Sequence, residues 1–123
     1  MENDISQNKN EEIIISLIVE NWRLTKLFQK VASKLAPSEQ NRYINQLRYF
    51  QKTINNALKD INMSIVDLEN KNYDPGMAVS PMNIDEFEAD DNLVIDQVIE
   101  PLIIDRNGTI KKEGIVTLRK EKQ

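Results

Sequence analysis

The first half of the chain carries apolar residues at the spacing of an amphipathic helix. From residue 14 to residue 35 they recur at alternating steps of three and four, which predicts a helix over about residues 10–35. A single polar residue among the a positions of a heptad pattern, here Asn21, is typical of helices that pair in a fixed register. The stripe is therefore expected to pack against another helix. Its a positions are Ile14, Asn21, Phe28 and Leu35, and its d positions are Leu17, Leu24 and Val31.

A second helix is predicted over about residues 37–61. Pro37 interrupts the first pattern, and proline is tolerated in the first turn of a helix, where its missing N–H would have no partner. Apolar positions then recur from Tyr43 to Ile61 in a shifted phase. Two such helices have too little mass to cover both stripes, so we expect a homodimer with a four-helix arrangement. The residues expected at its interface are Ile14, Leu17, Asn21, Leu24, Phe28, Val31, Leu47, Phe50 and Ile54.

From residue 73 the pattern changes to short apolar runs separated by turn signals. The runs between residues 93 and 104 predict strands, with an edge or a break at Pro101. Asn107-Gly108 predicts a hairpin with a type I′ turn, in which both central residues have positive φ. Gly114 is expected to form a bulge in the returning strand, Thr109 to Leu118.

These patterns together predict an α+β fold. We expect a flexible tail at residues 1–9, a helical dimerisation region at residues 10–72 and a small all-β domain at residues 73–123. At 123 residues the chain has room for one modest domain and an appendage.

Composition lowers the expectation of an enzyme. The chain has no histidine and no cysteine, which removes the commonest general base, thiolate catalysis and the commonest transition-metal ligands. The acidic stretch from Asp85 to Asp91 lacks the glycine and ligand spacing of a calcium loop and is read as a solvated loop, so no metal or other cofactor is expected. A carboxylate-dependent enzyme is a remote third hypothesis.

Charge and hydropathy restrict the expected partners and location. A net charge of -4 argues against a nucleic-acid partner, because nucleic-acid binding normally requires a positive excess. The apolar run from Ile13 to Val19 is much shorter than a membrane span, and the polar start of the chain does not resemble a signal peptide. A cytoplasmic protein with protein partners and no membrane association is expected.

The C-terminal third resembles a known family. Residues 92–120 resemble the terminal β-domain of GrpE-type nucleotide exchange factors, which runs as a valine-rich strand, a turn to an aromatic-leucine pair, Asn-Gly, a second strand and a closing apolar-Val-Thr-Val segment. In this chain Leu102-Ile103-Ile104 precedes the Asn-Gly turn, and Ile115-Val116-Thr117-Leu118 forms the close. Tyr73-Asp74-Pro75 resembles the Phe-Asp-Pro of that family. The resemblance covers about the last 50 residues, and the helices match only in their order along the chain. The chain departs from the family where Pro101-Leu102 replaces Gly-Tyr.

The resemblance implies a homodimeric co-chaperone that binds the nucleotide-binding domain of a DnaK-type chaperone ATPase and promotes ADP release. By family position, partner contact falls on Val98 and Leu118, with Leu102 and Asn107 nearby. For Val98 and Leu118, plain strand core is the other interpretation. The alternative function is a dimeric scaffold or adaptor of the same architecture without exchange activity.

Overall fold

The structure is a computed structural model that describes residues 2–122, with the side chains of residues 8–122. The chain divides into two compact units, Met1–Ile61 and Asn62–Gln123, called here the helical unit and the β unit. The α+β prediction is confirmed, because within residues 2–122 two helices are followed by six strands in two small sheets.

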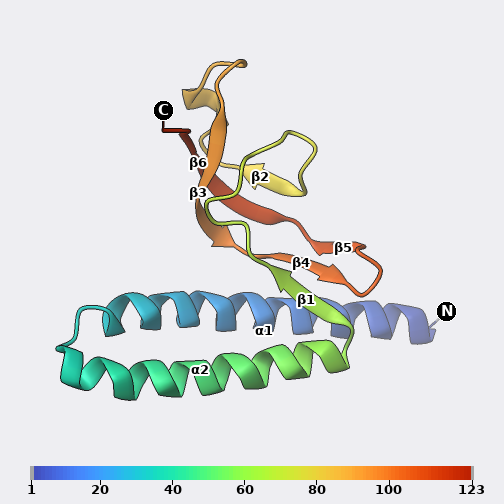
Figure 1. Cartoon of the computed structure of the whole chain (residues 1–123). Coiled ribbons are helices and arrows are strands. Elements are labelled where there is room, and N and C mark those ends of the chain that lie inside the picture. The colour runs from blue at the N-terminus through green and yellow to red at the C-terminus, as the bar shows by residue number, and fades with distance from the viewer. Residues whose placement is uncertain (1, 123) are drawn as a thin grey trace. The chain divides into compact units, whose positions relative to one another are not determined.

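The helical unit is a hairpin of two helices, α1 (Glu2–Ala32) and α2 (Pro37–Asp60), which run in opposite directions (Figure 1). Pro37 lies in the first turn of α2, as its fixed φ and missing N–H favour. The Gln40 side chain stabilises the loop between the helices, because it donates hydrogen bonds to the carbonyl oxygens of Ser33 and Leu35 at 2.9 and 2.8 Å. α2 ends before Asn62, whose φ of 59° lies in the left-handed region that stops a helix.

The N-terminal boundary differs from the prediction. The tail expected at residues 1–9 is helical from Glu2, and α1 ends at Ala32 rather than near residue 35. Propensity does not account for this, because Asn3, Asp4, Ser6 and Asn8 are weak helix formers. A helix that has already formed gains one hydrogen bond per added residue, so it extends without an apolar stripe. At the other end, the Lys34 and Leu35 N–H groups donate hydrogen bonds to carbonyls three residues back. This is the spacing of a 3₁₀ turn, so the α-helix ends here.

The β unit is built from two three-stranded sheets. Their orders are β1-β4-β5 and β2-β6-β3, and all pairs are antiparallel except β2 with β6. The elements are β1 (Met63–Val66), β2 (Val79–Pro81), the 3₁₀ turn η1 (Ile84–Glu86), β3 (Leu93–Glu100), β4 (Leu102–Asp105), β5 (Ile110–Lys112) and β6 (Gly114–Lys120).

The boundary between the two units lies earlier than predicted. Residues 62–72 were expected to belong to the helical region, but β1 pairs with β4 from Met63↔Asp105 to Val66↔Leu102. This pairing partner lies about 40 residues away in the sequence, so no local pattern reveals it. The segment after β1 also joins the β unit, because the Asn70 and Ile95 N–H groups bond to the Ile95 and Lys71 carbonyls at 2.9 Å.

One core holds the β unit together. Its buried members come from strands of both sheets and from the segment after β1: Leu68, Val79, Leu93, Ile95, Leu102, Val116 and Leu118. Tyr73, Met77 and Phe87 pack against this core from the connecting segments. Apolar burial of this kind is the main stabilising contribution in a domain of this size.

The C-terminal half of the β unit is one long hairpin that bends between the sheets. Both of its arms change sheet, at Pro101 between β3 and β4 and at Gly114 at the start of β6. The break predicted at Pro101 is confirmed. Gly114 is not the bulge that was expected. Bulges occur instead in β3 and at Lys111 of β5, since consecutive residues Ile103 and Ile104 of β4 pair with Lys112 and Ile110. A Cβ on Gly114 would lie 3.3 Å from Val79 Cγ1, so this glycine permits close packing at the bend.

The hairpin turn has a different type from the one predicted. Gly108 has a φ of 82°, but Asn107 is not among the residues with positive φ, so the turn is not type I′. The Gly108 N–H bonds to the Asp105 carbonyl at 3.0 Å, and the Asp105 N–H bonds to the Thr109 carbonyl at 2.9 Å. This is a type I turn followed by a glycine bulge. The Asp105 carboxylate also accepts hydrogen bonds from the Asn107 and Thr109 N–H groups. These bonds favour the observed turn over the predicted type I′ turn.

Candidate functional site

The helical unit leaves part of its apolar stripe uncovered. The three d positions of α1, Leu17, Leu24 and Val31, are all more than half exposed. Phe28 of α1 and Phe50 of α2 are each more than one-third exposed. Of the other residues predicted at the dimer interface, Leu47 is buried, whereas Ile14, Asn21 and Ile54 are half-buried. The exposed members therefore form an apolar face that α1 and α2 do not cover for each other.

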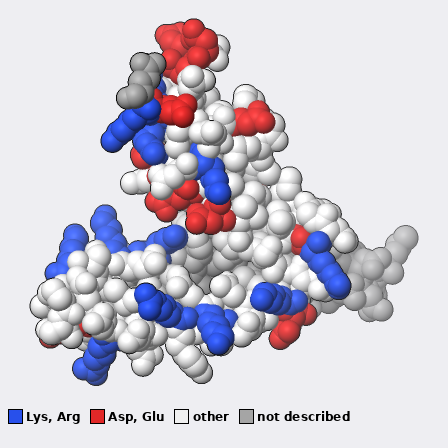
Figure 2. All heavy atoms as spheres, in the orientation of Figure 1, with Lys and Arg blue, Asp and Glu red and all other residues white. Residues whose placement is uncertain are grey.

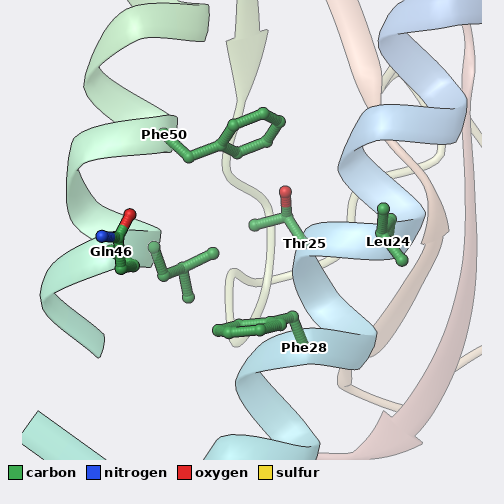
Figure 3. Close-up of a pocket in the computed structure, with 6 residues that line it drawn as sticks. Leu24, Thr25, Phe28, Gln46 and Phe50 are labelled. Atoms are coloured by element: carbon green, nitrogen blue, oxygen red, sulfur yellow. The ribbon is translucent and has the colours of Figure 1, made fainter. Parts of the chain in front are cut away.

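A groove lies within this face, between the two helices (Figure 3). It has a volume of about 250 Å³ and is lined by Leu24, Thr25, Phe28, Gln46, Leu47 and Phe50. Phe28 also packs edge to face on Tyr43, with ring centroids 6.2 Å apart. Apolar side chains on both walls of an open groove fit an inserted side chain from another helix.

The Asn21 side chain makes a hydrogen bond to the backbone of its own helix. Its side-chain amide donates to the Leu17 carbonyl at 3.0 Å. The amide is thereby partly satisfied within one chain, and its oxygen remains available to a second helix. Sequence reasoning identified this position but not the local bond, because side-chain bonds to the carbonyl four residues back do not alter the apolar pattern.

The apolar face extends beyond the predicted residues. Ile13 and Leu27 on α1 and Tyr43 on α2 are also exposed. Tyr43 belongs to the predicted seam of α2, so the pattern contained a signal for it. Ile13 and Leu27 stand next to predicted positions and widen the stripe on α1.

The four residues predicted to contact a partner through the β unit do not share one surface. Leu118 is only 3% exposed and Leu102 is 8% exposed, and both belong to the core of the β unit. Val98 is half-buried and packs against the same core. Asn107 is exposed at the hairpin turn. For Leu102 and Leu118 the structure favours the strand-core interpretation, since a buried side chain touches a partner only if the fold opens.

Other apolar side chains are exposed on the β unit, and sequence reasoning did not select them. Met82 and Ile84 lie just after β2, Ile99 lies in β3, and Ile110 begins β5. Between Met82 and Ile84, Asn83 is held against β6. Its amide nitrogen donates to the Leu118 carbonyl at 2.9 Å, and its oxygen accepts from the Leu118 N–H at 2.8 Å.

Charge is unevenly distributed over the surface. On the face drawn in Figure 2, Asp and Glu gather over the β unit, and Lys and Arg over the helices. Ion pairs within the β unit include Lys112 with Glu100, Arg119 with Asp96 and Lys120 with Asp91. Arg119 also donates to the Ile95 carbonyl and the Asn70 side chain, which ties the segment before residue 73 to the sheet.

Among the side chains that the structure describes, those of residues 8–122, no group of carboxylates is arranged to hold a metal ion. Asp85, Glu86, Glu88 and Asp90 are all exposed, as expected of a solvated loop. Neither helix, over its described length, has an apolar stretch long enough to cross a membrane. No protein-family model, curated protein or solved structure matches the chain.

Proposed function

We propose that this protein is a dimeric co-chaperone that binds the nucleotide-binding domain of a DnaK-type chaperone ATPase and promotes release of ADP. The observation that carries the proposal is the fold of residues 92–120. The segments that resemble the GrpE-type β-domain form one bent hairpin, β3 to β6, within a compact β unit that follows a helical hairpin. This is the order of parts that the resemblance implies.

The uncovered apolar face of the helical unit supports self-association. Leu17, Leu24 and Val31 would each gain burial in a four-helix arrangement of two copies. A closed twofold contact covers the same face on both copies and leaves no apolar stripe exposed. The dimer would carry two copies of the β unit.

Such a protein would act without making or breaking a covalent bond. It would bind the nucleotide-free form of the chaperone more tightly than the ADP-bound form, and this difference in affinity limits how far it can shift the equilibrium. The absence of histidine and cysteine from the sequence is compatible with this mode of action.

A second candidate is a dimeric scaffold of the same architecture without exchange activity. The burial of Leu102 and Leu118 favours it, because these two family positions do not offer side chains to a partner. The scaffold would keep the dimer and the β unit but would not distinguish the nucleotide states of the chaperone.

Release of a fluorescent ADP analogue separates the two candidates. A DnaK-type chaperone from the same genome is loaded with the analogue and mixed with excess unlabelled nucleotide, with and without this protein. The co-chaperone proposal predicts a release rate that rises with protein concentration and then saturates. Binding to the chaperone without faster release would favour the scaffold, and a chaperone that does not bind at all would refute the proposed partner.

A further inference from the structure

We infer that Met82 and Ile84, together with the acidic residues that follow them, form a docking surface for a folded protein whose own apolar patch is bordered by Lys and Arg. The segment from Met82 to Ile84 is called here the 82–84 ledge. The inference rests on the proposed function, because it takes the chaperone ATPase as that folded protein.

The ledge presents two large apolar side chains to solvent. Met82 is 67% exposed and Ile84 is 39% exposed. A single exposed apolar residue on a protein surface is ordinary, but here two are separated by only one residue. Methionine also adapts its shape to varied partners, which suits a contact surface.

The backbone of the ledge is fixed against the sheet. The Met82 N–H bonds to the Val116 carbonyl at 2.9 Å, which continues the pairing of β2 with β6. The Asn83 side chain then makes two hydrogen bonds, one to the N–H and one to the carbonyl of Leu118. These are the backbone groups of β6 that a longer β2 strand would otherwise pair with. Phe87, just beyond η1, packs on the core. Because both ends are anchored, binding would order little additional chain, and this favours affinity.

The charged residues that follow the ledge in the sequence are all acidic. The adjoining strand β6 carries Arg119 and Lys120, and each of these cations is paired with a carboxylate, that of Asp96 and that of Asp91. No Lys or Arg occurs from Tyr73 through Asp105 in the sequence. In the part of the chain that the structure describes, Asp85, Glu86, Glu88 and Asp90 form no ion pair. Their charge is therefore available to a basic partner, whereas an acidic partner would be repelled. Complementary charge around an apolar centre speeds association and selects the partner.

Binding of the full-length protein to the DnaK-type chaperone, measured by calorimetry over a series of salt concentrations, tests the ledge. The double variant Met82→Gln, Ile84→Asn is expected to bind at least about tenfold more weakly, since interface anchors commonly contribute this much. The double variant Asp85→Lys, Glu86→Lys is expected to bind more weakly at low salt and to lose most of the salt dependence. All four residues are exposed, so the fold should persist, which far-UV circular dichroism checks.

Ile110→Asn is the matched control. Ile110 is an exposed apolar residue of the β unit like Met82, but it lies in β5 of the other sheet. It should change the affinity less than about twofold. If the unchanged protein binds and the ledge variants bind equally well, the ledge is not the docking surface and the proposed function stands. If the unchanged protein does not bind the chaperone, the proposed function fails and the inference fails with it.

Discussion

Replacing Leu24 by Ala tests the apolar face of the helical unit with little risk to the fold. Leu24 is 63% exposed, and it lines the groove between α1 and α2. Alanine is a better helix former than leucine, so α1 should remain intact. The variant is therefore expected to keep the protomer and weaken only its association with a second copy.

The size of the effect follows from the surface that association would cover. Full burial of a leucine side chain stabilises by roughly 1.5–3 kcal/mol, so covering the exposed part of Leu24 is worth about 1–2 kcal/mol in each copy. A twofold contact loses this twice, about 2–4 kcal/mol in total. At 1.4 kcal/mol per factor of ten, the dimer dissociation constant should rise roughly 30- to 700-fold.

Sedimentation velocity over a range of concentrations measures this shift. The unchanged protein is expected to be a dimer at micromolar concentration, and the Leu24→Ala variant a monomer or a concentration-dependent mixture. Tyr49→Ala is the control, because Tyr49 is 73% exposed but lies outside the predicted seam of α2. A monomeric unchanged protein, or equal dissociation constants for the Leu24 and Tyr49 variants, would refute the assignment of this face.

Three further substitutions test the fold. Leu118→Asp places a carboxylate at a buried core position and is expected to unfold the β unit. Amide NMR spectra would then lose the dispersed signals of the strands. A folded variant that only loses partner binding would show that Leu118 is a contact residue. Asn21→Leu is expected to raise the melting temperature and mix the oligomeric states, and unchanged melting of a clean dimer would contradict the predicted register. Gly108→Ala is expected to cost about 1 kcal/mol in urea unfolding because φ is 82° there, and an unchanged midpoint would contradict the turn assignment.

Local signals in the sequence were sufficient for most elements. The three-and-four spacing located both helices, and Pro37 marked the start of α2. Short β-branched runs located β3 and β4, and Pro101 marked the break between them. Each of these features depends on residues within a few positions of one another, which is where sequence patterns are informative.

The turn type around Asn107 was missed for a local reason, because the Asp105 carboxylate accepts hydrogen bonds from N–H groups two and four residues later. Other errors in the β unit arose where distant residues decide the structure: β1 exists because it pairs with β4. Gly114 looked like a bulge in one strand because the change of sheet at that residue depends on packing against Val79 and Leu102. Tertiary contacts of this kind leave no periodic signal in the sequence.

The candidate site was predictable only in part. The apolar stripe on α1 follows from the heptad pattern, but the pattern does not tell which of its members α2 covers. Family position selected Leu102 and Leu118, whereas burial assigns both to the core of the β unit. Met82 and Ile84 had no sequence signal, because their exposure follows from the attachment of Asn83 to the backbone of β6.

The affinity of the protein for a DnaK-type chaperone, measured with and without saturating ADP, tests the central claim most directly. A factor that promotes ADP release must bind the ADP-free chaperone more tightly, and by linkage ADP must weaken its binding by the same factor. The account predicts a clearly higher dissociation constant in the presence of ADP. Equal dissociation constants in the two conditions would contradict it, even if binding itself were tight.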